Sequence, residues 1–319
     1  MSGTAPEAGR PGASILPYSR VVGQDDLKLA LELNHVAPGI GGVLMAGQRG
    51  TAKSTLVRAF ALMAHGELPV TLPINATDDR VVGGWRLDAL MRGETLEQPG
   101  LLEEAHDKGI LYVDEVNLLD DHVVNIILDV VSTGQLSVQR EGLAAARQLD
   151  FGLVGTMNPE EGGLRPQLLD RFGLMVTAAD LDTDARHRMI RTVLAFEEAR
   201  ARDTSEWLTD AERDNAAVRD RLRAARERFA QVDVPDPVLR LCAEAAGRLD
   251  AVGQRGEIVA THAARALAAL EGAERVEPRH LLRVLPPALR HRRPEAAHGG
   301  TFDWGPDDHA RIKDLFDAG

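Results

Sequence analysis

The chain has 319 residues and a formal net charge of −12, and 44% of its residues are hydrophobic but only 4% aromatic. An acidic chain is a poor candidate for a nucleic-acid partner, because phosphate recognition needs a basic face. Its one cysteine, Cys242, excludes an intrachain disulfide and a cysteine-based zinc site. No apolar run approaches the ~20 residues that span a membrane, and the first residues lack the apolar segment of a signal peptide. We therefore expect a soluble, cytoplasmic protein with no membrane partner.

The first half of the chain alternates strand and helix signals. Residues 1–16 are rich in Gly, Pro, Ala and Ser, which predicts a disordered tail. Short apolar runs that stop at glycine or polar residues are typical of buried parallel strands. Together they predict an α/β domain over residues 17–183, built on a parallel sheet. The expected elements are helices over 25–35 and 53–65 and strands over 41–46, 70–74, 110–113, 151–156 and 174–177.

The second half contains helical patterns only. Apolar residues recur at helical spacing and charged residues occupy the remaining positions. The pattern predicts a smaller all-helical domain over residues 184–291 and a polar C-terminal tail over 292–319, whose role the sequence leaves open. Phe302, Trp304 and Phe316 are large apolar residues within that tail, and we expect them to dock on the rest of the chain. The expected helices cover residues 186–201, 212–231, 235–249, 257–270, 278–289 and 309–316.

A glycine-rich loop follows the apolar run 41–46 and opens the helix at Lys53. This context is typical of a phosphate-binding loop, because glycines turn backbone N–H groups toward phosphate oxygens and the helix N-terminus adds its dipole. Lys53 would reach the β- and γ-phosphates of ATP, and the Ser54 hydroxyl would ligate Mg²⁺. An ordinary glycine-rich turn is the alternative. The loop consists of Gly47, Gln48, Arg49, Gly50, Thr51, Ala52, Lys53, Ser54 and Thr55.

Acidic and polar residues follow two other predicted strands. Asp114 and Glu115 end the apolar run 110–113, and Asn158 follows the run 151–156. Ligands of open α/β sheets bind at the carboxyl edge, where these residues would lie. We expect Asp114 to hold Mg²⁺, Glu115 to polarise the attacking water, and Asn158 to orient that water or contact the γ-phosphate.

With these motifs in place, residues 18–291 resemble AAA+ ATPases, specifically the I subunits of magnesium chelatases and their cobalt-chelatase relatives. The most specific stretch is Met157–Leu174, with the sequence MNPEEGGLRPQLLDRFGL. Supporting stretches are TDDRVVG at 77–83, PGLL at 99–102, DEVNLL at 114–119, RGE at 255–257 and ARALAAL at 264–270. The resemblance implies an AAA+ core followed by a helical lid, ATP and Mg²⁺ as cofactors, and an ATPase activity.

The resemblance also assigns roles to residues outside the two motifs. Arg171 looks like the arginine finger that one subunit supplies to its neighbour's ATP, with Asp170 orienting it. Arg255 looks like the sensor 2 arginine that brings the lid onto the nucleotide, and Arg265 is the alternative. Three residues match the segment that passes near adenine: Val22, Gly23 and Gln24.

Two segments of the sequence match insertions of the family, and two features depart from the family's pattern. Residues 85–97 occupy the position of the family's helix-2 insert, and residues 134–150 carry the signal of a hairpin before the sensor strand; a plain surface hairpin is the alternative. Ala52 replaces the glycine usual in photosynthetic magnesium chelatases, and the segment before Val70 is short. Because of these two departures, the resemblance leaves open which metal and which tetrapyrrole the protein serves.

The resemblance implies the motor of a metal chelatase. It would form a homo-oligomer, a hexameric ring, with a von Willebrand A-type D subunit and a large tetrapyrrole-binding catalytic subunit as partners. The alternative is a MoxR-type AAA+ chaperone that remodels a von Willebrand A-domain partner or inserts a metal cofactor into an enzyme. A nucleic-acid motor and an inactive ring subunit are further alternatives.

Overall fold

The computed structural model describes residues 14–85, 89, 91–92, 96–140, 143–202, 204–294 and 302–317. Five parallel strands form its central sheet, in the order β2-β5-β8-β1-β9. This confirms the predicted parallel α/β fold. The strands are β1 (Val43–Ala46), β2 (Val70–Leu72), β5 (Ile110–Val113), β8 (Gly152–Met157) and β9 (Leu174–Thr177).

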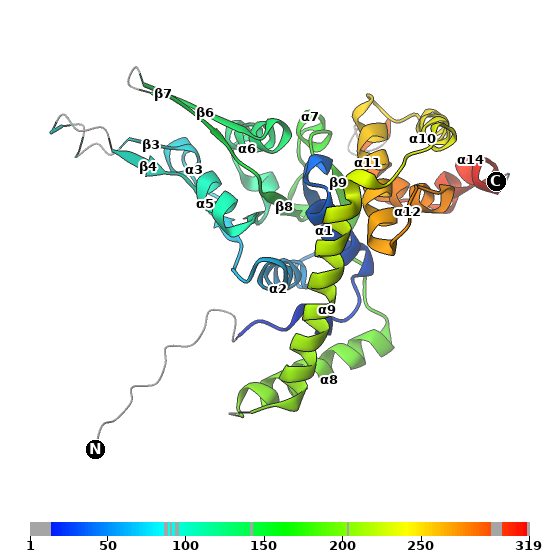
Figure 1. Ribbon diagram of the computed structural model, residues 1–319, viewed down its shortest axis with the longest axis horizontal. Helices are drawn as coiled ribbons and strands as arrows, with labels where there is room; N and C mark the ends of the chain where they lie inside the picture. The colour runs from blue at the N-terminus through cyan, green and yellow to red at the C-terminus, as the bar shows by residue number, and fades with distance from the viewer. Residues whose placement is uncertain are drawn as a thin grey trace.

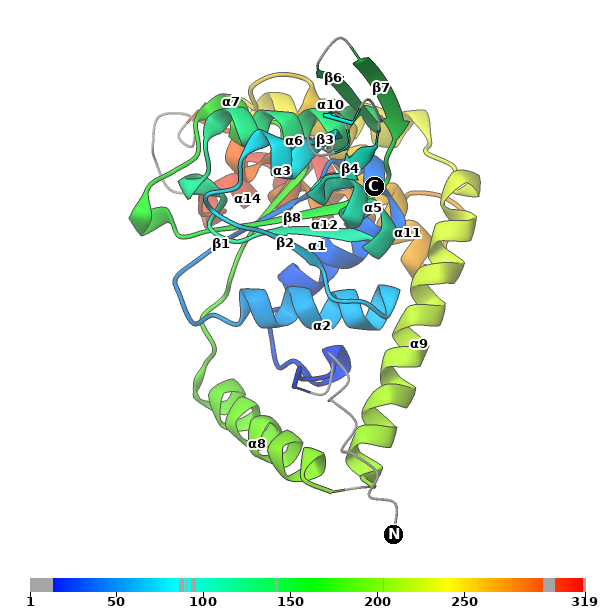
Figure 2. The same ribbon diagram turned by 90° about the vertical axis from the view of Figure 1, so that its left-hand side faces the viewer.

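Helices cover both faces of this sheet (Figures 1 and 2). Successive residues of a strand point to opposite faces, and β1 follows this rule. Val43 and Met45 pack in one buried cluster with α1 (Asp25–Val36) and α2 (Lys53–His65), whereas Leu44 and Ala46 pack in a second. The second cluster also receives side chains from α5 (Leu101–Lys108) and α6 (Asp121–Thr133). Both faces of the strands are therefore buried, which explains their uniformly apolar sequences.

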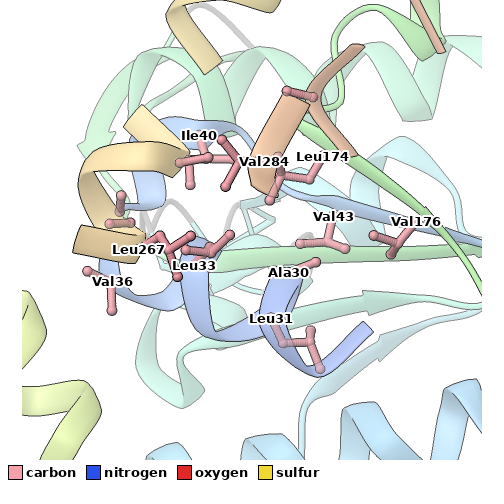
Figure 3. Packing of buried hydrophobic residues seen from close by; sticks show 14 of the residues in the cluster. Ala30, Leu31, Leu33, Val36, Ile40, Val43, Leu174, Val176, Leu267 and Val284 are labelled. Atoms are coloured by element: carbon pink, nitrogen blue, oxygen red, sulfur yellow. The ribbon is translucent and has the colours of Figure 1, made fainter. Parts of the chain in front are cut away.

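The C-terminal half is helical, as predicted. Helix α8 extends away from the sheet at the bottom of Figure 1, and α9 runs from there back to the centre of the molecule, where Leu222 and Ala225 join the first cluster. The later helices pack closely on the sheet: Leu267 of α11 and Val284 of α12 meet Leu33, Val43 and Val176 in the first cluster (Figure 3). One continuous core thus joins the sheet to the helical half. The helices are α8 (Thr183–Arg200), α9 (Glu206–Arg228), α10 (Asp236–Arg248), α11 (Arg255–Glu271) and α12 (Pro278–Leu289).

Two hairpins project from the sheet at the upper left of Figure 1. One pairs β6 (Gln135–Arg140) with β7 (Leu143–Gln148), where the sequence predicts a hairpin. The other pairs β3 (Gly83–Trp85) with β4 (Glu97–Pro99), after the short helix α3 (Asp78–Val82). These strands flank the predicted insert, most of which lies outside the described residues.

The two ends of the chain are more ordered where described than the sequence indicates. Ile15 and Leu16 pack against the first cluster, whereas the disorder expected for residues 1–13 lies outside the described part. The tail boundary at residue 292 stays a prediction, and the Arg292 side chain at that boundary is fully buried. Beyond it, α14 (Pro306–Asp317) is a helix, and residues 295–301 are not described. Docking of the three apolar tail residues is confirmed: Trp304 and Phe316 pack on the first cluster and Phe302 on the second. No described helix is long and apolar enough to cross a membrane.

Candidate nucleotide-binding site

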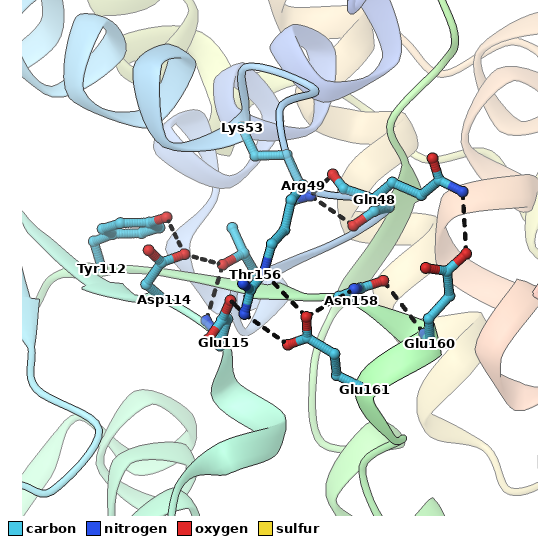
Figure 4. Close-up of polar contacts among 11 residues, drawn as sticks. Gln48, Arg49, Lys53, Tyr112, Asp114, Glu115, Thr156, Asn158, Glu160 and Glu161 are labelled. Carbon is cyan, nitrogen blue, oxygen red and sulfur yellow. Dashed lines mark hydrogen bonds and ion pairs between the residues drawn. The ribbon is translucent and has the colours of Figure 1, made fainter.

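The glycine-rich loop connects β1 to α2 at the carboxyl edge of the sheet, as the motif predicts. Lys53 is the first residue of α2, and its ammonium group donates to the loop's own carbonyl oxygens at Gly47 and Gln48, each at 2.7 Å. Burial lowers the pKa of Lys53, and the carboxylates of Asp114 and Glu115 act in the opposite direction. A cation therefore lies at the centre of the loop (Figure 4).

Strained backbone is concentrated at this site. In the described part of the chain, four residues other than glycine have positive φ angles, and three of them are site residues: Gln24 at 59°, Ala52 at 61° and Glu115 at 54°. Left-handed backbone is unfavourable for residues with a Cβ and recurs at functional sites. Ala52 takes the conformation that a glycine accepts without strain, so its replacement of the family's usual glycine keeps the loop's shape.

This geometry leads to a stability prediction for Ala52. We expect Ala52→Gly to raise the free energy of unfolding by about 0.5–1 kcal/mol, because relief of left-handed strain outweighs the added freedom of the unfolded chain. Urea unfolding of both proteins measures the difference. Gly247 is the matched control: it lies within α10 and carries no positive φ angle, so Gly247→Ala should stabilise through helix propensity instead. A destabilised Ala52→Gly protein would contradict the strain argument.

Asp114 belongs to a partly buried network that sequence reasoning did not find. The hydroxyl of Tyr112 lies 2.7 Å from Asp114 Oδ1 and 2.8 Å from Ser54 Oγ, and so bridges the two predicted magnesium ligands. Thr156 on β8 donates to the same carboxylate at 2.6 Å and accepts from the Glu115 backbone N–H at 3.1 Å. Burial raises the pKa of Tyr112 to about 12, so this hydroxyl keeps its proton. The only feature of the sequence that could have indicated this network is a tyrosine in an otherwise aliphatic strand.

Glu115 and Asn158 lie at the ends of neighbouring strands, where the sequence predicts them. Glu115 Oε1 pairs with Arg49 Nη2 at 3.0 Å. The Asn158 amide donates to Glu161 Oε1 at 3.1 Å, and Arg49 Nε lies 3.0 Å from that same oxygen. The structure therefore brings the loop, Asp114, Glu115 and Asn158 together. It adds Glu161, whose contacts the motif alone does not indicate.

The segment expected near adenine lies beside the residues that follow β9. Gln24 donates to the Ala179 carbonyl at 2.8 Å, and its amide oxygen accepts from the Ala179 N–H at 3.1 Å. Gly23 has a φ of 68°, and a Cβ there would come within 2.7 Å of Leu181. Because Ala179 follows the carboxyl end of β9, this segment is on the phosphate-loop side of the sheet.

The two arginines assigned by resemblance lie at the opposite edge of the sheet. Arg171 precedes β9, and its guanidinium donates to Asn125 at 2.8 Å and pairs with Asp129, both on α6. Arg255 begins α11 and lies beside Gly41, before β1, where an added Cβ would come within 3.2 Å of its Nη2. Neither side chain reaches the loop of its own chain. The sensor 2 role of Arg255 therefore stays a prediction.

Two expectations for these arginines need correction. Asp170 does not orient Arg171; it accepts from Arg292 Nε at 2.9 Å. Arg265, the alternative to Arg255, donates to the carbonyl groups of Val232 and Ala230 at 2.8 and 2.7 Å, so it fixes α11 to the turn that follows α9.

Comparisons with known proteins agree with this geometry. A model of the AAA domain, dynein-related subfamily, matches residues 42–172, and a model of the AAA lid domain matches residues 239–308. The magnesium-chelatase 38 kDa subunit of Rhodobacter capsulatus is 40% identical to this chain, over 89% of this chain and 90% of that protein. The subunit of the same name from Cereibacter sphaeroides is 42% identical, over 86% and 91%. The chain belongs to the family of magnesium-chelatase AAA ATPase subunits.

Other relatives extend the comparison. An uncharacterized protein of Mycobacterium tuberculosis is 44% identical over 87% of this chain, which spans only 44% of that longer protein. A chain in a cryo-EM-based model of the complex between subunits BchI and BchD of magnesium chelatase is 38% identical, with a TM-score of 0.50, over 93% of this chain and 99% of that one. The crystal structure of a proposed ATPase from Cytophaga hutchinsonii has a TM-score of 0.64 over 94% and 90%, at 18% identity, and shows the fold alone. As an AAA ATPase, this magnesium-chelatase homologue binds a nucleotide.

Proposed function

We propose that the chain is the ATP-hydrolysing motor subunit of a metal chelatase, and that it drives metal insertion into a tetrapyrrole held by a partner. The observation that carries this proposal is the convergence of the phosphate loop, Asp114, Glu115 and Asn158 at one sheet edge, in a chain similar to magnesium-chelatase subunits over most of its length. We assign residues 17–183 to the ATPase domain and residues 184–291 to the lid.

A magnesium ion fits the residues present. Mg²⁺ prefers hard oxygen ligands and in nucleotide sites binds one or two protein groups together with phosphates and water. Ser54 and Asp114 offer a hydroxyl and a carboxylate that one tyrosine hydroxyl already bridges. Among the described residues, no cluster of three or more His, Cys, Asp or Glu side chains could hold a metal ion by itself. A bound magnesium ion would neutralise charge that develops on the phosphates.

The remaining residues then have distinct roles. Lys53 binds the β- and γ-phosphates in place of the loop carbonyl groups that it contacts now. Glu115 accepts a proton from the attacking water, and Asn158 orients that water or the γ-phosphate. Val22, Gly23 and Gln24 lie against adenine. Gly47, Gln48, Gly50, Thr51 and Thr55 supply backbone and hydroxyl contacts to the phosphates.

A ring explains the position of the two arginines. Arg171 and Arg255 both lie at the edge of the sheet that faces away from the phosphate loop. In a closed head-to-tail ring each subunit presents one face to the next subunit's opposite face. Both guanidinium groups would then reach the neighbour's nucleotide, Arg171 as the finger and Arg255 as sensor 2. We propose a homo-hexameric ring as the active unit.

Partner subunits follow from the relatives. The complex of BchI with BchD supports a D-type subunit with a von Willebrand A domain as a partner of this ring. A large catalytic subunit would hold the tetrapyrrole. Copurification of the tagged chain with each of these subunits, followed by a chelation assay with and without ATP, tests this assignment.

Two substitutions separate nucleotide binding from hydrolysis. We expect Lys53→Ala to weaken ATP binding by at least about tenfold, because it removes a charge-assisted contact to the phosphates. Glu115→Gln should stop hydrolysis without weakening ATP binding, because the phosphate-loop lysine remains intact. Equilibrium binding of a fluorescent ATP analogue and a phosphate-release assay measure the two effects.

The matched control for Glu115→Gln is Glu160→Gln, since Glu160 is exposed and contacts only Gln48 among the described side chains. It should leave hydrolysis within about twofold of the wild-type rate. Equal loss of ATP binding in the Lys53 and Glu115 variants would contradict the separate roles proposed for these residues.

A further inference from the structure

One side chain in the site has no role in the chemistry assigned above: Arg49, at the tip of the phosphate loop. Its side chain is 70% exposed, yet its guanidinium contacts two carboxylates from two other segments. Nη2 lies 3.0 Å from Glu115 Oε1, and Nε lies 3.0 Å from Glu161 Oε1. Figure 4 shows this guanidinium between the two acids. Glu115 is the proposed base, so the loop tip directly engages the group that must act on water.

A second contact joins the same segments. Gln48, the residue before Arg49, donates to Glu160 Oε1 at 3.1 Å. Glu160 and Glu161 belong to the short helix η4 (Pro159–Glu161), which directly follows Asn158. The tip of the phosphate loop is therefore connected through two side chains to the turn that carries the proposed sensor residue. Each of the two contacts joins residues that are 112 positions apart in the sequence.

The charges around Arg49 allow its guanidinium to exchange one anionic partner for another. One guanidinium faces two carboxylates, and ion pairs at exposed positions contribute at most about 1 kcal/mol. A γ-phosphate bound next to Lys53 would bring further negative charge to the loop from which Arg49 projects. The planar fork of arginine matches a phosphate as well as a carboxylate. A γ-phosphate can therefore compete with Glu115 for this guanidinium.

We propose that Arg49 is a positioning residue that holds Glu115 in the nucleotide-free site and transfers to the γ-phosphate of ATP, which releases Glu115 for the attacking water. This inference rests on the proposed ATPase function and adds a nucleotide discriminator to it. ADP lacks the γ-phosphate and leaves Arg49 on Glu115 and Glu161. Arg49 therefore contributes to the affinity for ATP and not to the affinity for ADP.

The test compares two fluorescently labelled nucleotides, ADP and the non-hydrolysable β,γ-imido analogue of ATP, each with Mg²⁺. Arg49→Ala should weaken binding of the ATP analogue by about tenfold, as expected for a lost charge-assisted contact, and change ADP affinity by less than about twofold. Arg49→Lys keeps the charge without the fork and should fall between these values. Arg49 is exposed, so its replacement removes no core contact, and thermal unfolding of each variant checks that the fold is intact.

A second variant should act in the opposite direction. Glu161→Gln removes a carboxylate that competes for Arg49 but keeps an amide oxygen as the acceptor for Asn158. It should strengthen binding of the ATP analogue by about threefold and leave ADP binding unchanged. In the double variant with Arg49→Ala this gain should vanish, because no guanidinium remains to transfer. Glu160→Gln is the matched control: it removes the same charge one residue away, makes no contact with Arg49 and keeps an amide oxygen that accepts from Gln48, so it should change neither affinity.

The outcomes separate this inference from the function on which it rests. A wild-type chain that binds neither nucleotide would refute the ATPase proposal, and the role of Arg49 with it. In another outcome, the wild-type chain binds and hydrolyses ATP while Arg49→Ala loses affinity equally for the ATP analogue and for ADP. That result would overturn the role of Arg49 as a nucleotide discriminator and leave the ATPase proposal intact. Unchanged affinities in Arg49→Ala, or equal gains in Glu161→Gln and Glu160→Gln, would overturn it as well.

Discussion

Arg171→Ala is expected to lower the rate of ATP hydrolysis by roughly 10³–10⁵-fold, the typical cost of removing an arginine finger. Nucleotide affinity should stay within about twofold, because Arg171 lies at the edge of the sheet opposite the phosphate loop and contacts Asn125 and Asp129 of its own chain. A phosphate-release assay and equilibrium binding of an ATP analogue measure the two quantities. Arg165→Ala is the control: that exposed side chain pairs with Asp121 and should leave the rate within about twofold.

Mixed rings test whether the finger acts on a neighbour. A Lys53→Ala subunit keeps Arg171, and an Arg171→Ala subunit keeps Lys53. Each variant alone should be nearly inactive. In a mixture, sites that pair an intact Lys53 with a neighbour's intact Arg171 exist, and part of the activity should return. Absence of recovery, with subunit exchange confirmed by labelled protein, would argue against a shared site. A dilute monomer with full activity would refute the ring.

Arg292→Ala is expected to reduce the free energy of unfolding by about 3–5 kcal/mol, because it removes a buried guanidinium and leaves buried carbonyl oxygens unpaired at ~1–3 kcal/mol each. Its guanidinium is fully buried and donates to the Asp170 carboxylate at 2.9 Å. It also donates to four carbonyl oxygens, those of Asp170, Phe172, Gly173 and Ala288 at 2.5–3.0 Å. Each carbonyl left unpaired in the core adds a desolvation cost.

Chemical denaturation of purified protein measures the effect of Arg292→Ala. Arg311→Ala provides the comparison, because Arg311 forms an exposed ion pair with Asp250 and should contribute less than about 1 kcal/mol. Similar losses of unfolding free energy in Arg292→Ala and Arg311→Ala would contradict the stabilising role of the buried Arg292 side chain. The variant also reports on assembly: Arg292 binds the backbone that precedes β9, next to Arg171, so its loss should loosen the position of the finger.

The two edges of the sheet carry different parts of the proposed ATPase site. The phosphate loop and Glu115 meet at the carboxyl edge of the sheet, and Arg49 connects them to the turn after Asn158. The other edge carries Arg171, held between α6 and the lid-anchored segment before β9. In the ring proposed above, this edge would face the phosphate loop of the neighbouring subunit. This geometry fits a motor whose chemistry and assembly depend on one another.

The sequence by itself determined the elements and residues whose signals are local. The loop from Gly47 to Thr55, the acids after β5 and Asn158 after β8 each lie directly beside an apolar strand. Because all five strands are parallel, those strand ends meet at one edge, and a correct strand pattern was enough to assemble this part of the site. Helix α12 and strands β5 and β9 have the predicted bounds for the same reason, since their apolar runs end at clear breaks.

Only the tertiary structure decided the contacts between distant segments. Arg255 lies beside Gly41 rather than at the loop, and Asp170 accepts from Arg292 rather than from Arg171. Tyr112 bridges Ser54 to Asp114, and Arg49 reaches Glu161. Tyr112 and Asp114 are two residues apart, but every other pairing joins segments more than fifty residues apart and therefore has no local signal in the sequence. Burial of Arg292 was missed for the same reason: a run of arginines near a chain end indicates exposure until a core surrounds it.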